Sequence, residues 1–111
     1  MQQPELYELL NSIGLPLAYG EFKSTPELPA PDPPFLIYQF AYAGDLMADN
    51  RNYLEISNFQ VELYTNIKDL VAERLVQDAL IAAELPYSKT EASLETESMY
   101  QIIYEIQLIG G

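Results

Sequence analysis

Residues 99–109 alternate between two kinds of side chain more strictly than any other part of the sequence. Every second position is apolar or aromatic (Tyr100, Ile102, Tyr104, Ile106 and Leu108), and the positions between them are Gln101, Ile103, Glu105 and Gln107. Because successive side chains of a β-strand point to opposite faces, this period of two predicts a long strand with one buried face. It is the clearest β signal in the chain.

Three further segments are predicted to be strands. Residues 35–42 form a continuous run of aromatic and β-branched side chains, and residues 53–64 alternate, with Phe59, Val61 and Leu63 on the face expected to be buried and Gln60, Glu62 and Tyr64 on the other. Residues 87–92 are expected to form a short strand, followed by a polar, acidic connection over 93–97. Residues 43–52 are rich in Asp and Asn, and they are expected to be an irregular connection that holds Leu46 and Met47.

Two segments show helical spacing. The first covers residues 4–13, where Pro4 suits the first turn, Gly14 suits the stop and the apolar stripe is Leu6, Leu9, Leu10 and Ile13. The second runs from Ile67 to about Glu84, with Thr65-Asn66 as the expected N-cap and Pro86 ending it. Its expected buried stripe is Ile67, Val71, Leu75, Ala79 and Ala82/Ala83.

The apolar stripe of the long helix is widened by Leu70, Val76, Leu80 and Ile81. Leu80 and Ile81 lie about 100° apart around a helix, so one sheet surface does not obviously cover both. Two interpretations stay open, namely a deeply buried helix in a monomer and a second surface that contacts another subunit. The candidate subunit-contact residues are Leu80, Ile81, Leu46 and Met47.

The order of elements is helix, strand, strand, helix, strand, strand. This order predicts an α+β fold, in which one small antiparallel or mixed sheet packs with one long and one short helix. A chain of 111 residues, 49% of them hydrophobic, can bury one core, and residues 1–111 are therefore expected to be a single domain.

Residues 24–34 contain five of the eight prolines. Proline lacks the backbone donor that a helix or a central strand needs, so this segment is expected to run extended over the surface. It is interpreted either as a plain linker or as a docking segment.

The charge of the chain limits its partners. Five basic and seventeen acidic residues give a net charge of −12, which disfavours binding to DNA or to an anionic membrane, because phosphate affinity comes from Lys and Arg. The alternatives are a solvated acidic surface, a basic protein partner, or a surface to which DNA must not adhere.

The side chains that most enzymes rely on are missing. There is no cysteine and no histidine, so thiolate nucleophiles, the commonest general base and the usual metal ligands are excluded. Asp49 and Asn50 lack the ligand spacing of a calcium loop. Glu91, Glu95 and Glu97 are expected in an exposed, solvated hairpin, where they suit a charged face and not acid–base work. We expect no catalysis, no cofactor and no metal.

Neither a signal peptide nor an apolar run of about 20 residues is present in the sequence, which predicts a soluble protein.

Several of these segments, taken in order, resemble a known family. They are Pro33–Tyr38, Met47–Tyr53, Phe59–Thr65, the helix from Ile67 and the closing Tyr100–Ile106. The set looks like small proteins from the head–tail joining region of phages and prophages of Gram-positive bacteria, and it is similar to the tail terminators of long-tailed phages. The proline-rich segment departs from that pattern.

The resemblance implies a structural role. Tail terminators form a hexameric ring that caps the tail tube, stops its growth and meets the head connector, and they use no cofactor. The expected partners are copies of the chain, the tail tube protein and the head connector or stopper, with assembly in the host cytoplasm and a final place at the head-proximal end of the tail. DNA would pass through the ring unbound, with Glu91, Glu95 and Glu97 as candidates to line its lumen. The rival functions are another neck or minor tail component, an acidic DNA-mimic inhibitor and a small hydrolase.

Overall fold

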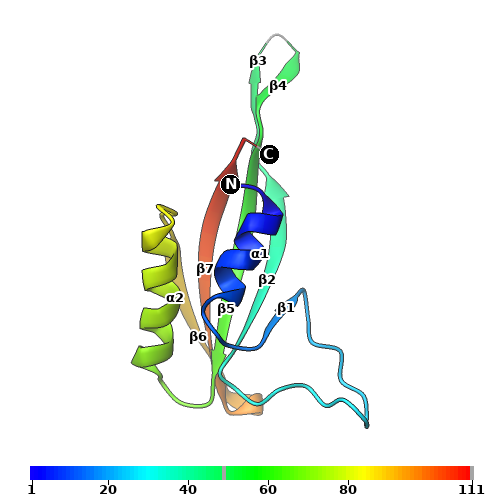
Figure 1. Cartoon of the computed structure of the whole chain (residues 1–111), viewed down its shortest axis with the longest axis vertical. Coiled ribbons are helices and arrows are strands. Elements are labelled where there is room, and N and C mark those ends of the chain that lie inside the picture. Colours follow the sequence, from blue (N-terminus) through cyan, green and yellow to red (C-terminus); the bar gives the residue numbers. More distant parts are fainter. Residues whose placement is uncertain (49, 111) are drawn as a thin grey trace.

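The strand predicted at the end of the chain is β7 (Met99–Ile109), which lies one place in from an edge of the main sheet (Figure 1). In this computed structural model, which describes residues 1–48 and 50–110, β7 pairs antiparallel with β5 (Ile56–Thr65) and with β6 (Ser88–Leu94). Four of the side chains predicted to be buried on one face of β7 are buried: Ile102, Tyr104, Ile106 and Leu108. The alternation therefore predicted both the strand and its orientation.

The main sheet has five strands in the order β1-β2-β5-β7-β6. β1 (Leu17–Tyr19) runs parallel to β2 (Phe35–Ala43), and the other neighbours are antiparallel. Within the described residues there are two α-helices, α1 (Gln3–Asn11) and α2 (Leu70–Ala82), and one turn of 3-10 helix, η1 (Glu95–Glu97). The predicted α+β fold with a mixed sheet is confirmed. β1 was not predicted, because three residues are too few to show a period.

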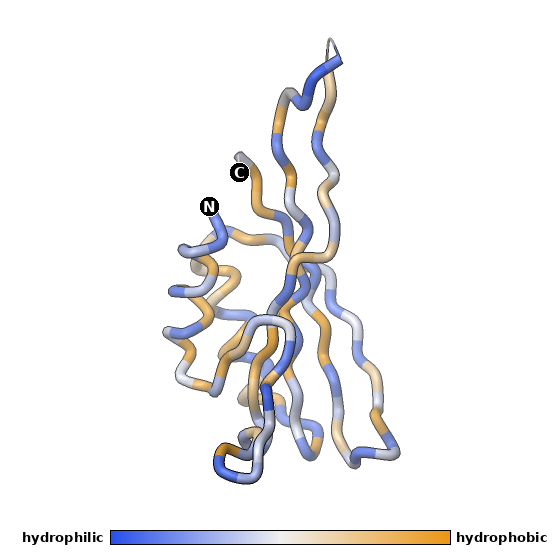
Figure 2. The backbone as a smooth tube through the Cα atoms, turned by 90° about the vertical axis from the view of Figure 1, so that its right-hand side faces the viewer, coloured by the Kyte–Doolittle hydropathy of each residue, from blue (hydrophilic) through white to orange (hydrophobic). Residues whose placement is uncertain are grey.

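Both helices lie over the same face of the sheet (Figures 1 and 2). The core between the two layers consists of apolar side chains of α1 and α2 and of inward-facing side chains of β2, β5 and β7 (Leu6, Leu10, Ala72, Val76, Leu80, Leu36, Tyr38, Phe59, Val61, Leu63, Ile102, Tyr104, Ile106 and Leu108). The hydroxyl of Tyr104 donates a hydrogen bond of 3.1 Å to Gln77 Oε1, so the one polar atom that β7 brings into this core has a partner. In the part of the chain that the structure describes, no helix covers the opposite face of the sheet.

α1 follows the sequence prediction closely. Pro4 lies in its first turn, and Glu5 Oε1 accepts a hydrogen bond of 3.1 Å from the backbone N–H of Gln2. Gly14, with a φ of +93°, turns the chain away after the helix, in a conformation that glycine adopts without steric cost. Leu6 and Leu10 are fully buried, and they hold this short helix against the sheet.

α2 begins later than predicted. Its N-cap is Asp69, whose Oδ1 accepts a hydrogen bond of 3.0 Å from the backbone N–H of Ala72, and the helix starts at Leu70 and not at Ile67. The expectation that Thr65-Asn66 caps the helix was wrong. Asp satisfies the orphan N–H groups of a first turn as well as Asn does, and Asp69 stands directly before the helix.

The buried stripe of α2 was also predicted wrongly. The buried residues are Ala72, Glu73, Val76, Gln77 and Leu80. The predicted stripe is instead exposed or half-buried, and it contains the exposed side chains of Ile67, Val71 and Leu75. Two apolar stripes lie on opposite sides of this helix, and the sheet covers the one that contains Val76 and Leu80.

Residues 43–52 are not an irregular connection. β3 (Leu46–Ala48) and β4 (Arg51–Leu54) pair as a two-stranded hairpin that projects beyond the main sheet (Figure 1). The carboxylate of Asp45 ties the base of the hairpin, because it accepts hydrogen bonds from Asn52 Nδ2 (2.6 Å) and from the backbone N–H of Ile56 (2.9 Å). Asp49, considered above for a cation site, lies outside the described residues.

Two strand limits also differ from the prediction. The strand expected over 53–64 is divided, since residues 53 and 54 belong to β4 and β5 begins at Ile56. β6 extends to Leu94, so the acidic connection is limited to η1 and Ser98.

Candidate assembly surfaces

The side of α2 that faces away from the sheet is apolar and uncovered. Its members are exposed by 46% to 74% of their surface, and we call them the outer face of α2: Ile67, just before the helix, and Leu70, Val71, Leu75 and Ile81 on it. At 3.6 residues per turn the four helical positions lie opposite the buried stripe. A single exposed apolar side chain is ordinary, but several on one side of a helix form a patch of the kind that marks an interaction site.

One weak ion pair crosses the outer face of α2. Arg74 Nη1 lies 3.4 Å from Asp78 Oδ1, and both side chains are more than 60% exposed. An exposed pair four residues apart on a helix contributes about 0.3–0.5 kcal/mol. The guanidinium of Arg74 is therefore held only weakly, and it can turn to another carboxylate at little cost.

A stronger charge cluster fixes the other side of α2 to the sheet. Glu73 is 3% exposed, and its two carboxylate oxygens lie 2.8 Å from Lys68 Nζ and 2.7 Å from Lys89 Nζ. The contact from Lys89 to Oε1 lacks hydrogen-bond geometry, so it acts as an ion pair. Lys68 also donates a hydrogen bond to Glu91. These contacts join the loop before α2, the first turn of α2 and β6.

The charge cluster sets the ionisation of Glu73. Burial alone raises the pKa of this carboxyl, but Lys68 and Lys89 together outweigh burial and hold the pKa below its usual value. The pKa of Lys68 is raised, because it donates to Glu73 and Glu91. Glu73 is therefore ionised in the folded protein at neutral pH.

Glu73→Gln is expected to reduce stability in a pH-dependent way. A carboxyl whose pKa is lower in the folded state stabilises the fold above its unfolded pKa of about 4.3, and this contribution disappears as the pH falls through the folded pKa. The free energy of unfolding of wild type should therefore exceed that of Glu73→Gln by about 1–3 kcal/mol at neutral pH. Urea unfolding at pH 7 and near pH 3 measures the difference, with Glu95→Gln in η1 as the control. A difference that does not shrink in acid would contradict this role.

The four predicted contact residues do not lie on one surface. Leu80 is fully buried against the sheet, so its prediction as a subunit contact was wrong. Ile81 is 57% exposed and belongs to the outer face of α2. Leu46 and Met47 are exposed on the projecting hairpin, well away from α2 (Figure 1).

The three predicted acidic residues are divided as well. Glu91 lies on β6 and is exposed in the β6–β7 hairpin as expected, but its carboxylate is paired with Lys68, which was not predicted. Glu95 and Glu97 are exposed in η1, at the turn between β6 and β7.

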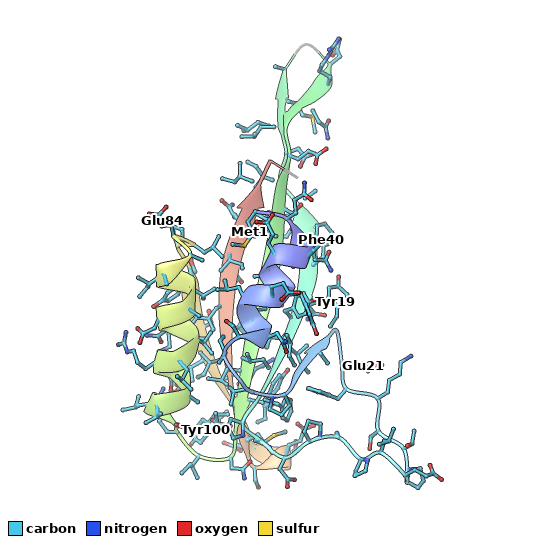
Figure 3. The ribbon with its side chains drawn as sticks, in the orientation of Figure 1. Met1, Tyr19, Glu21, Phe40, Glu84 and Tyr100 are labelled. Atoms are coloured by element: carbon cyan, nitrogen blue, oxygen red, sulfur yellow. The ribbon has the colours of Figure 1, made fainter. Side chains whose placement is uncertain are left out.

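A second exposed element is the segment from Glu21 to Pro34, which leaves the sheet beside β1 and returns into β2 (Figure 3). It is anchored at both ends by aromatic side chains, since Phe22 packs edge-on against Phe35, which stacks on Tyr64. At its tip the backbones of Thr25 and Leu28 exchange two hydrogen bonds, of 3.0 and 3.1 Å. Leu28 is 74% exposed. The proline-rich segment therefore has a defined turn that presents a leucine to solvent.

Sequence reasoning missed a second buried charge besides Glu73. Glu62, predicted on the exposed face of β5, is 5% exposed. It accepts hydrogen bonds from Gln39 (2.7 Å), Tyr64 (2.7 Å) and Gln101 (2.8 Å), which come from three adjacent strands. Burial and the nearby Glu62 carboxylate raise the pKa of Tyr64. The alternation places Glu62 on this face correctly, but two of the three donors that shield it, Gln39 and Gln101, are distant in sequence.

β7 has a free edge beside the end of α2. β6 begins opposite Glu105, so the backbone of Ile106–Ile109 has no partner from β6. An open groove of about 630 Å³ lies there, lined in part by Ala83, Tyr87 and Leu108. A strand edge of this kind is a further place where another chain can pair.

No family model and no curated protein matches the chain. Within residues 1–48 and 50–110, no group of three or more acidic side chains is arranged to hold a metal ion. No helix in the same residues has the length and hydropathy to cross a membrane.

Proposed function

We propose that this protein is a structural assembly protein that works by binding other copies of itself, and that it acts as a tail terminator of a long-tailed phage. The observation that carries the proposal is the outer face of α2, where four apolar side chains of the helix and Ile67 just before it are exposed, while the other side of the helix is packed on the sheet. Such a patch is stabilised when another protein covers it.

The position of the patch favours a ring. The molecule measures 51 × 30 × 26 Å, and α2 lies along one side of it (Figure 1). In such a ring each copy has two neighbours, and its patch meets a different surface of the next copy, so each copy needs a complementary surface elsewhere. Contacts of this heterologous kind close into a ring when the rotation between neighbours divides a full turn.

The charge of the chain fits the same role. At a net charge of −12 the surface does not attract phosphates, which suits a ring through which a genome passes. In this proposal the chain uses no cofactor and has no catalytic residue. Its other partners are the tail tube protein below and the head connector above.

Electron microscopy of tail tubes tests the proposal. Tubes assembled from the tube protein of the phage that carries this gene are expected to show a ring at one end after the chain is added, and to stop growing there. Bare tube ends, together with binding to the isolated head connector, would instead assign the chain to the neck. No binding to either structure would reject a role in head–tail joining.

A further inference from the structure

A partner for the outer face of α2 has to supply an apolar tip, and preferably a carboxylate for Arg74. Leu28 and the adjacent Glu27 together have these properties. Both are exposed, and Leu28 presents 74% of its surface to solvent. No ion pair of Glu27 is seen within the described residues, and Arg74 is held at 3.4 Å by Asp78 alone.

The tip of the segment cannot reach α2 of its own chain without crossing the sheet. Figure 3 places Glu21, where the segment begins, and Glu84, just beyond the end of α2, on opposite sides of the molecule. The segment lies at the same end of the long axis as the N-terminal half of α2 (Figure 1). A neighbouring copy displaced sideways, with its long axis parallel, therefore brings its segment beside the N-terminal half of α2.

The backbone of the segment is suited to docking. Five prolines in residues 24–34 fix φ and reduce the conformations that the free segment explores, which lowers the entropy lost on binding. The internal hydrogen bonds between Thr25 and Leu28 keep the tip in one turn before a partner arrives.

We propose that residues 21–34 of one copy dock on the outer face of α2 of the next copy, with Leu28 between Leu70, Val71 and Leu75 and Glu27 beside Arg74. This inference rests on the proposed self-assembly, and it names the two surfaces that meet. Each copy offers one segment and one helix face, so the contact is head-to-tail and repeats around a ring.

Mixing two complementary variants tests the contact. Leu28→Asp places a charge on the tip of the segment and leaves the outer face of α2 intact. Val71→Asp places a charge on the outer face of α2 and leaves the segment intact. Each variant alone is expected to be a monomer of 12.6 kDa by light scattering. Their mixture should form a 1:1 complex of about twice that mass that grows no further, since only one intact pair of surfaces remains.

Thr96→Asp in η1 adds the same charge away from both surfaces, and it should assemble like wild type. As a second measurement, Glu27→Arg and Arg74→Glu should each weaken assembly, and the two changes in one chain should restore it.

The outcomes separate this inference from the proposed function. One outcome is that wild type and Leu28→Asp both assemble and Val71→Asp does not. In that case α2 is an assembly surface but the segment is not its partner, and the inference is overturned. A mixture of the two monomeric variants that stays monomeric overturns it as well. A wild-type chain that neither assembles nor binds tail tubes overturns the proposed function and the inference together.

Discussion

Val71→Asp should abolish self-assembly without weakening the fold. Val71 is 74% exposed, and it stands in the first turn of α2, where an acidic side chain interacts favourably with the helix dipole. In an assembled ring the same carboxylate would be buried among apolar side chains, which costs at least about 2 kcal/mol. The dissociation constant should therefore rise by more than about 10-fold. Light scattering and thermal unfolding measure the two effects separately.

Leu75→Asp, one turn further along the outer face of α2, should act in the same direction. A Val71→Asp chain that assembles like wild type would show that copies do not meet through this helix.

Leu80→Ala and Ile81→Ala should differ sharply, although the residues are adjacent. Leu80 is fully buried, so its truncation leaves a cavity and should lower the free energy of unfolding by about 2–5 kcal/mol. Ile81 is 57% exposed, and its truncation should change stability by no more than about 0.5 kcal/mol.

In a domain of this size the loss at Leu80 corresponds to a fall of about 10 °C or more in Tm. Ile81→Ala should instead weaken assembly. Equal losses of stability at the two positions would mean that the apolar stripes of α2 are assigned to the wrong sides.

The strands could be predicted from sequence because their period is simple. In β7 and in most of β5 one face is apolar and the other mainly polar, so alternation alone indicates which side chains are buried. β1 and the projecting hairpin could not be found in this way, because their strands have only three or four residues. The hairpin depends on Asp45, which joins its two ends through side-chain hydrogen bonds.

The orientation of α2 could not be predicted, since both of its sides are apolar. Glu73 suggests an exposed face from sequence alone, yet Lys68 and Lys89 neutralise it in a buried position. Lys89 comes from β6, beyond the end of the helix, so this compensation appears only in three dimensions. The same applies to Glu62, whose donors lie on three strands. Sequence patterns therefore predict burial wrongly for charged side chains whose partners are distant in the sequence.

The outer face of α2 was therefore visible in the sequence as a surplus of apolar residues, but most of these residues were predicted to pack on the sheet. The residues expected to pack on the sheet, Val71 and Leu75 among them, are those left uncovered. The widened stripe left open whether the helix is buried on all sides or has a second apolar surface. Only the packing of Val76 and Leu80 shows which of them the fold itself uses.

Sedimentation velocity of the wild-type chain over a wide range of concentration tests the central claim most directly. Association between copies predicts that the 12.6 kDa monomer gives way, as concentration rises, to one closed species, which is a hexamer if the chain is a tail terminator. A single monomeric boundary at every concentration, unchanged when tail tubes are present, would contradict the account.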